Sequence, residues 1–178
     1  MIERGIQVDH SNIMRWVHQY SPEIEKRIRR HLRPTNNSWR VDETYIKVKG
    51  KWKYFYQAVD SNGDTIDFML NSKRNRKTAK RFFKKALSSN HNQIPREITV
   101  DKNPAYSPAI DELKNDNILH KNVGNRQIKY LNNIIEQDNR SISRIVNSML
   151  GFQSFRSANK TLKEIEAMNM IKKDKSII

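Results

Sequence analysis

The sequence contains no cysteine among its 178 residues. This absence excludes disulfide bonds, zinc sites built on thiolates and cysteine nucleophiles, so any metal ion must be held by oxygen or imidazole ligands. Glycine is scarce too, with five in the chain, and no glycine-rich loop of the kind that cradles nucleotide phosphates is present. The histidines are scattered without the spacing of metal ligands, which argues against a zinc site; they are His10, His18, His31, His91 and His120.

Long apolar runs are also missing from the chain. No window approaches 18 consecutive apolar residues, and the first 20 residues lack the apolar core of a secretory signal. We therefore expect a protein that stays in the cytoplasm and has no membrane partner. Acidic residues are few beside basic ones, 19 against 34, which gives a formal charge of +15 and a pI of about 10.1. Such a balance favours a polyanion as partner, most simply nucleic acid.

The organisation of the chain indicates one compact domain with an appendage. Residues 1–33 read as helical and end in the basic run KRIRRHLR. Residues 34–38 then supply proline, threonine, asparagine and serine, which is typical of a linker. Residues 39–178 follow with a different architecture, in which strands come first and helices dominate later.

The pattern after the linker predicts an α/β domain. Strands are expected at 39–48, 52–59 and 65–70, with the Asn62-Gly63 pair turning the chain between the second and third, so that the three form an antiparallel meander. A basic-faced helix at 75–87 follows, and the later elements are expected at the ranges listed here: a strand at 97–101, a helix at 104–114, a fifth strand at 118–120 and helices at 130–149 and 157–172. Trp52, Tyr54 and Tyr56 alternate with lysines, and strand packing explains these rings better than base stacking does.

Three acidic residues lie on predicted strands and a helix that can bring their side chains together. Asp42 lies midway along the first strand, Asp101 at the carboxyl end of the fourth, and Glu136 on the polar side of the helix after the fifth. Carboxylates so clustered can hold two Mg²⁺ ions about 4 Å apart, with Mn²⁺ as a substitute, and such a pair supports in-line phosphoryl transfer. A polar helix side bearing Glu136 is equally what a solvated surface looks like, so the pattern alone leaves both readings open.

Four segments carry a resemblance to a known family: WRVDETYIKVKGKWKYFYQAVDSNG, TVDKNPAY, NRQIKYLNNIIEQDNR and LGFQSFRSA. They resemble the bacterial insertion-sequence transposases of family six, a DDE group with a ribonuclease-H-like catalytic domain. The resemblance implies a mixed five-stranded sheet, three strands antiparallel and then two parallel, flanked by helices and preceded by a partial helix-turn-helix segment. It implies Mg²⁺-dependent cleavage and strand transfer of DNA at insertion-sequence ends, with Asp42, Asp101 and Glu136 as catalytic residues and metal ligands. Glu43 would point to the opposite face of its strand.

The same resemblance implies the partners of the chain. These are DNA, both the terminal inverted repeats of the element and the target, and further copies of the chain, because the active form would be a homo-oligomer. The residues expected to contact DNA are Asn12, Arg15, Lys102, Lys129, Arg140 and Arg144.

The amino-terminal segment resembles the family in part. DHSNIMRWVHQY reads as a recognition helix capped by Asp9 or Ser11, but only MIER precedes Gly5, whereas relatives carry a longer leader. We interpret residues 1–33 as a partial helix-turn-helix DNA-binding segment that is truncated at its amino terminus. The alternative interpretation is a helix that simply caps the catalytic domain.

Three positions depart from the family pattern. Relatives usually show histidine where this chain has Asn125 and Asn139, and a basic residue where it has Ser143. Imidazole and amide are not equivalent donors or proton carriers. A second hypothesis therefore stands beside the transposase: a truncated, catalytically weak relative that only binds DNA or inhibits a full-length transposase.

Overall fold

The computed structural model describes residues 8–128, 133–148 and 152–173. Their strands form one mixed sheet in the order β3-β2-β1-β4-β5. Strands β1 (Ser38–Val48), β2 (Lys51–Asp60) and β3 (Thr65–Asn71) make the antiparallel meander, and β4 (Glu97–Val100) and β5 (Gly124–Gln127) extend it in parallel from β1. The predicted five-stranded sheet, three strands antiparallel and then two parallel, is confirmed.

The β1–β2 hairpin closes on a two-residue turn. Lys49 and Gly50 both have positive φ, 49° and 73°, as a type I′ turn requires, and this turn matches the twist of the strands that it joins. The ladder runs from the Trp39–Asp60 pair to the Val48–Lys51 pair without a bulge. The turn and the continuous ladder together hold the hairpin rigid out to its tip.

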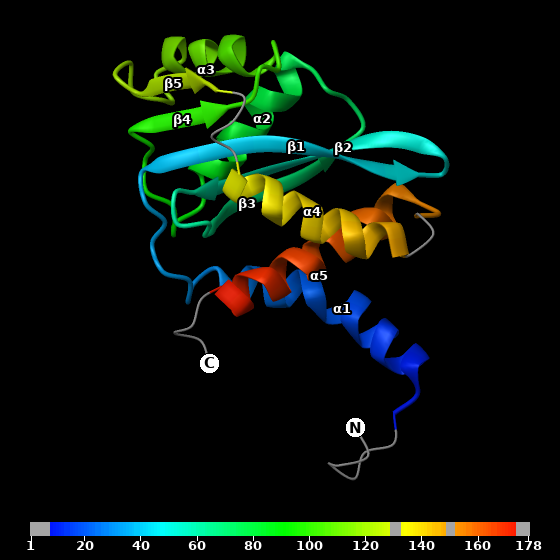
Figure 1. The fold of residues 1–178 in the computed structure, drawn as a ribbon. Helices are drawn as coiled ribbons and strands as arrows, with labels where there is room; N and C mark the ends of the chain where they lie inside the picture. The colour runs from blue at the N-terminus through cyan, green and yellow to red at the C-terminus, as the bar shows by residue number, and fades with distance from the viewer. Residues whose placement is uncertain (1–7, 129–132, 149–151, 174–178) are drawn as a thin grey trace.

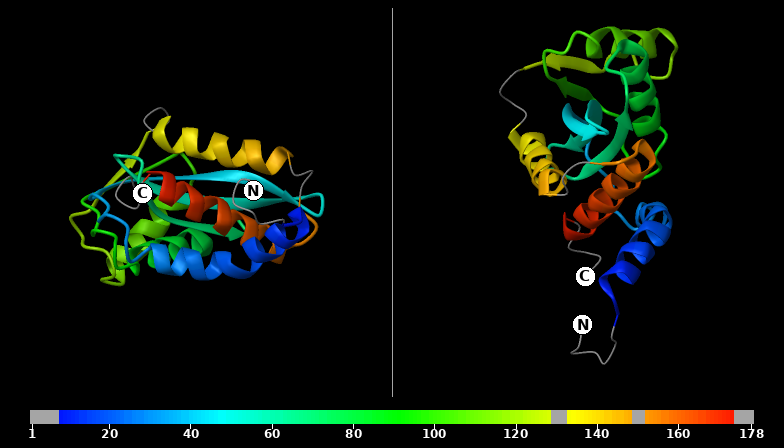
Figure 2. Two further views of the ribbon diagram at one scale, coloured as in Figure 1. Left: turned by 90° about the horizontal axis from the view of Figure 1, so that it is seen from below. Right: turned by 90° about the vertical axis from the view of Figure 1, so that its right-hand side faces the viewer.

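Helices cover both faces of the sheet (Figures 1 and 2). Helices α2 (Arg76–Leu87) and α3 (Tyr106–Asn115) pack on one face, where Phe82, Phe83 and Tyr106 are fully buried against the strands. Helix α4 (Asn133–Ser148) lies across the other face, and α5 (Phe155–Lys173) completes a second core there with Ile142 and Leu162 among its members. The helix predicted at 75–87 is therefore α2, which buries its apolar residues against the sheet.

The prediction of a fifth strand at 118–120 is wrong. Leu119 is buried, but it lies in the loop after α3, where its backbone N–H donates to the carbonyl of Leu113. The fifth strand is Gly124–Gln127, which pairs with β4 from Glu97–Gly124 to Val100–Gln127. Its sequence, GNRQ, has no β-branched or aromatic residue, so the strand is defined by backbone pairing at the sheet edge and carries no signal of its own.

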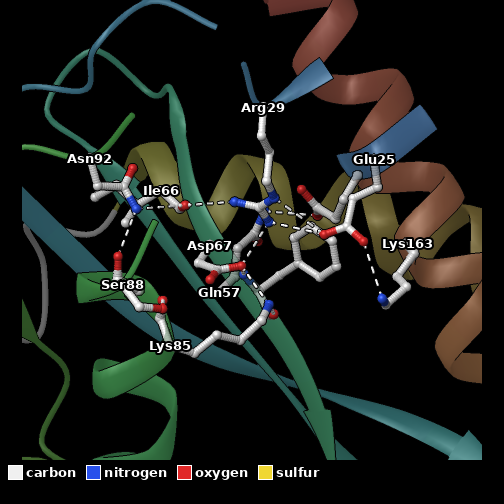
Figure 3. Close-up of polar contacts among 12 residues, drawn as sticks. Glu25, Arg29, Gln57, Ile66, Asp67, Lys85, Ser88, Asn92 and Lys163 are labelled. Carbon is white, nitrogen blue, oxygen red and sulfur yellow. Dashed lines mark hydrogen bonds and ion pairs between the residues drawn. The ribbon is translucent and has the colours of Figure 1, made fainter. Parts of the chain in front are cut away.

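Helix α1 (His10–Ile28) packs along α5 beneath the sheet (Figure 1). Its amino-terminal cap is Asp9, whose carboxylate accepts from the backbone N–H of Ser11 at 2.7 Å. Arg29, just after the helix, donates to the carboxylates of Glu25 at 3.2 Å and of Asp67 on β3 at 2.8 Å (Figure 3). Asp67 is 1% exposed and also pairs with Lys85 of α2 at 2.6 Å. This network joins α1 to the sheet.

The segment between α1 and the sheet is bound in place. Thr35 is buried and its backbone N–H donates to the carbonyl of His91, while the N–H of Asn36 donates to Asp60 at 2.8 Å. Ser38 is already the first residue of β1. The proposed division into residues 1–33, 34–38 and 39–178 stays a prediction. None of the helices in the described ranges combines the length and the apolar content that crossing a bilayer requires.

Candidate active site

Two acids follow the last paired residues of neighbouring parallel strands. The β1–β4 ladder ends at the Val41–Val100 pair, and the next residues along the two strands are Asp42 and Asp101. Because parallel strands carry equivalent positions to the same edge of a sheet, the two carboxylates converge there. Together with Glu43 they form a group in which one ligand oxygen from each residue lies within 4.8 Å of the others.

Asp42 is half-buried and held by two donors. One carboxylate oxygen accepts from the backbone N–H of Glu43 at 2.8 Å, and the other accepts from the Nδ2 atom of Asn139 on α4 at 2.9 Å. Burial raises the pKa of Asp42 to about 6, and the neighbouring charges of Asp101 and Glu43 act in the same direction. The ionised carboxylate is therefore costly in the protein alone, and a cation beside it would relieve that cost.

Glu43 is buried on the opposite face of β1, as predicted. Its carboxylate accepts from the hydroxyl of Tyr106 on α3, from Asn103 Nδ2 at 2.9 Å and from the guanidinium of Arg74 at 2.5 Å. Burial raises the pKa of Glu43 and Asp101 adds to this, while Tyr106 and Arg74 oppose it. Three donors from three separate segments thus converge on one carboxylate beside the Asp42–Asp101 pair.

The loop after β4 is tied to this carboxylate. The backbone N–H of Asn103 donates to Asp101 Oδ1 at 2.9 Å, and the side chain of Asn103 both donates to Glu43 and accepts from the N–H of Ala105. Asn103 therefore fixes the position of Asp101 relative to β1. Asn103, Tyr106 and Arg74 were not predicted as site residues; for Asn103 the available signal was the Asx-type turn that begins at Asp101.

Glu136 occupies the first turn of α4 and faces the same cleft as Asp42. Its carboxylate is partly exposed and lies 3.9 Å from the guanidinium of Arg140. It is not a member of the group within 4.8 Å that Asp42 and Asp101 form. The structure therefore brings Asp42 and Asp101 within 4.8 Å of each other and places Glu136 in the cleft that Asp42 lines.

Several predicted DNA contacts surround this cleft. Arg140 and Arg144 are exposed and line it, and the exposed Lys102 follows Asp101 directly. Asn12 and Arg15 lie on α1, which packs along α5 rather than at the acid-bearing strand ends. Lys129 lies outside the described residues.

The three departures from the family pattern have distinct surroundings. Asn139 contacts Asp42 directly, and its own Oδ1 atom is buried without a hydrogen-bond partner among the described residues. Asn125 lies on β5, where its Nδ2 atom donates to Ser107 at 2.9 Å. Ser143 lines the cleft, with its hydroxyl 3.5 Å from that of Thr44. Two of the three departures, Asn139 and Ser143, are therefore in the cleft itself.

The donors at this site suit a hard divalent cation. Carboxylate oxygens from Asp42 and Asp101 are the ligands that Mg²⁺ prefers in proteins, and the described part of the chain offers no sulfur or imidazole ligand to this group. The raised pKa of Asp42 is a second indication, because close acids repel one another until a cation neutralises them. The residues present thus fit magnesium.

Comparisons with known proteins match most of the chain. A family model described as a DDE domain matches residues 36–175. The chain is 36% identical over 166 residues to a transposase for insertion sequence-like element IS431mec of Staphylococcus aureus, a match that covers 93% of this chain and 71% of that protein. It is 35% identical over 165 residues to the transposase for insertion sequence element IS257 in transposon Tn4003, also from Staphylococcus aureus, with the same coverage.

A solved structure shares the fold. The catalytic core domain of HTLV-2 integrase, determined as a dimeric form in complex with magnesium, superposes with a TM-score of 0.54. The match covers 79% of this chain and 86% of that one, at 20% sequence identity. This likeness shows that the sheet and its helices have the ribonuclease-H-like arrangement.

Proposed function

The chain belongs to the insertion-sequence transposases of family six, whose catalytic unit is a DDE domain, and from that membership we propose that it cleaves DNA strands at the ends of an insertion sequence and transfers them to a target in a Mg²⁺-dependent reaction. The observation that carries this proposal is the convergence of Asp42 and Asp101 at the ends of two paired parallel strands. No packing requirement explains two adjacent carboxylates at this edge.

The metal would be held by Asp42 and Asp101, with Glu136 as the third ligand from across the cleft. When bound, magnesium would supply the charge that activates the attacking hydroxyl and stabilises the leaving oxygen of the phosphodiester. The HTLV-2 integrase core in complex with magnesium supports this choice of metal. The Glu136 carboxylate is partly exposed and pairs with Arg140 at 3.9 Å, so metal binding would require it to turn from Arg140 toward the two aspartates.

The protein supplies orientation through the network around Glu43. Asn103 links Glu43 to the Asp101 loop, so the separation of the two aspartates is set before metal or DNA arrives. Asn139 orients the Asp42 carboxylate from the other face. Ligands fixed by such outer contacts hold their geometry without reorganisation during the reaction.

Positive charge around the cleft would bind the DNA backbone. Arg140 and Arg144 line the cleft and Lys102 lies next to Asp101, so the phosphates on either side of the reacting one would meet cations. The terminal inverted repeats and the target DNA are the proposed partners, in line with the insertion-sequence transposases to which the chain is similar. An active homo-oligomer is also proposed, and the dimeric form of the integrase core supports it.

A cleavage assay tests the proposal. The purified chain is incubated with a labelled duplex that carries the terminal repeat of its element, with Mg²⁺ or with EDTA. We expect strand cleavage in Mg²⁺ only, and a cleavage rate at least about 100-fold lower in Asp101→Asn. Loss of a residue that merely contacts a metal ligand costs about 10- to 100-fold, and loss of the ligand itself should cost more. Asp111→Asn, which removes an exposed acid on α3, is the matched control and keeps the parent rate.

Two outcomes would contradict the proposal. Cleavage that persists at the parent rate in Asp101→Asn would show that Asp101 has no part in the reaction. Salt-dependent DNA binding without cleavage by the parent in Mg²⁺ or Mn²⁺ would favour the catalytically weak relative that only binds DNA.

A further inference from the structure

The β1–β2 hairpin exposes two large aromatic rings beside the acids. Tyr45 is 49% exposed and Trp52 is 59% exposed, whereas Tyr56 on the same strand as Trp52 is fully buried. Core burial therefore accounts for Tyr56, whereas Trp52 packs edge-to-face on Tyr45 of the neighbouring strand and keeps more than half of its surface exposed. The preference for strand packing over base stacking at Trp52 stays a prediction. Exposing that much of a tryptophan forgoes its burial energy, and exposed rings gathered on one surface are typical of a binding site.

The rings form one continuous surface, here called the aromatic platform and made of Tyr45, Trp52 and Tyr54. The strand register opposes Tyr45 to Tyr54 and Lys47 to Trp52, so these four side chains share one face of the hairpin. The ring centroids of Tyr45 and Trp52 are 6.4 Å apart, and those of Tyr45 and Tyr54 are 5.5 Å apart. Edge-to-face contacts between the rings keep them fixed on the rigid hairpin.

Two cations lie against the platform. Lys47 places its ammonium 5.8 Å from the centroid of the Trp52 ring, and Arg74 places its guanidinium 6.0 Å from that of Tyr45. The hairpin from residue 44 to residue 56 contains no acid, and its lysines at 51 and 53 alternate with Trp52 and so point to the other face. The core of a protein interface is depleted of charge, so exposed rings held between two cations suit a polyanion better than an apolar partner chain.

Arg74 connects the platform to the candidate active site. The same guanidinium that lies over Tyr45 donates to Glu43, whose carboxylate belongs to the group with Asp42 and Asp101. Tyr45 is two residues from Glu43 along β1 and shares its face, about 7 Å away at 3.4 Å per residue, whereas Asp42 points to the other face. This is about two base steps of a DNA strand at 3.4 Å per step. The pairing of β1 with β4 ends at Val41, so a DNA strand whose phosphate lay at the acids would cross this edge of β1 and bring its neighbouring bases over the platform.

From these observations we propose that the aromatic platform binds unpaired DNA bases next to the phosphate that reacts. This inference rests on the proposed function for the position of the DNA strand. Bases in an intact duplex are stacked and paired, so only bases that have left the helix can lie on the rings. Every base has a π-face, so the platform accepts them with little sequence preference, while Lys47 and Arg74 bind the backbone. The chain would thus favour DNA that is frayed or single-stranded near the cleavage point.

Binding in EDTA tests the platform without any cleavage. Three labelled DNAs share one duplex: the first is blunt, the second carries an unpaired three-nucleotide extension, and the third carries an abasic extension with the same phosphates. We expect the parent to bind the extension with bases about 5- to 100-fold more tightly than the abasic one, because stacking contributes about 1 to 3 kcal/mol per base and 1.4 kcal/mol is tenfold. The comparison with the abasic extension removes the contribution of charge.

Variants assign this preference to the rings. Trp52→Ala is expected to reduce it to less than about 2-fold, and Trp52→Phe, which keeps an aromatic ring, is expected to retain part of it. Ile94→Ala replaces an exposed apolar residue in the loop before β4 and keeps the parent preference. Trp52→Ala is expected to bind the abasic extension as the parent does, which would show that its loss of base preference is not caused by unfolding.

Three results would contradict the inference or distinguish its failure from that of the proposed function. Equal binding of the two extensions by the parent, or an undiminished preference in Trp52→Ala, contradicts the platform. A change from dimer to monomer in Trp52→Ala, with the base preference intact, would show that a second copy of the chain covers these rings instead. Absence of cleavage in Mg²⁺ together with a base preference that depends on Trp52 would reject the proposed function alone.

Discussion

Replacing Asp42 by asparagine is expected to stabilise the metal-free protein at neutral pH while it removes a proposed metal ligand. Burial, assisted by Asp101 and Glu43, raises the pKa of Asp42 from 3.8 to about 6. A carboxyl with a raised pKa favours the folded state in its neutral form, so its contribution is fully present below about pH 3.8 and is lost as the pH rises through 6. Above pH 6 the ionised Asp42 destabilises the fold.

The magnitude follows from this shift. A difference of 6 − 3.8 = 2.2 in pKa corresponds to about 3 kcal/mol at 1.36 kcal/mol per unit, and solvent contact reduces it to roughly 1 to 3 kcal/mol. The introduced amide keeps the local hydrogen bonding. In the parent, Asn139 donates to Asp42 through Nδ2, while the buried Oδ1 atom of Asn139 has no partner among the described residues. Rotation of the Asn139 amide lets that oxygen accept from the new side chain.

Chemical denaturation in EDTA at pH 4 and pH 7.5 measures the effect. The free energy of unfolding of Asp42→Asn should exceed that of the parent by about 1 to 3 kcal/mol at pH 7.5 and match it within about 0.5 kcal/mol at pH 4. Asp111→Asn, at an exposed position, should show no such pH-dependent difference. If Asp42→Asn is no more stable than the parent at pH 7.5, burial does not raise the pKa of Asp42 as argued here.

Two further predictions concern other parts of the chain. Asp67→Ala removes the buried carboxylate that pairs with both Arg29 and Lys85 and should lower the free energy of unfolding by about 3 kcal/mol. Glu23→Ala, which breaks an exposed pair with Arg27, should lower it by under about 1 kcal/mol, and similar losses in the two variants would contradict the importance of the network. Ser143→Lys should raise the rate of Mg²⁺-dependent cleavage of a terminal-repeat duplex by roughly 10- to 100-fold, because a charge-assisted phosphate contact contributes about 1.5 to 3 kcal/mol. Arg144→Ala should lower the same rate. An unchanged rate in Ser143→Lys would show that this position does not hold DNA.

The strands of the meander were predictable because each carries its own signal. Aromatic and β-branched residues alternate along β1 and β2, and Asn62-Gly63 marks the turn before β3. The edge strand β5 carries no such signal, since its residues are polar and its pairing with β4 depends on tertiary structure. The fifth strand was predicted instead at residues 118–120, where the sequence is apolar. Leu119 is apolar because it is buried in the loop after α3.

The site was predictable only where chemistry follows directly from strand order. Asp42 and Asp101 stand at equivalent positions of two paired strands, so a correct topology was enough to bring them together. The partners of Glu43 come from three separate segments, which no local pattern could relate. The alternation of side chains along β2 likewise gives the face on which Trp52 lies, but it does not show whether a helix covers that face. The tip of the hairpin extends beyond α2 and α3, so Trp52 stays exposed (Figure 1).

Binding of Mn²⁺ to the protein alone, followed by the loss of the free-ion signal in electron paramagnetic resonance, shows whether Asp42 and Asp101 form a metal site. We expect the parent and Asp111→Asn to bind Mn²⁺ alike and Asp101→Asn to bind it at least about 10-fold more weakly, because Asp42 and Asp101 present their oxygens to one cation. If Asp101→Asn binds Mn²⁺ as tightly as the parent, the two aspartates that follow the last β1–β4 pair are not the metal site.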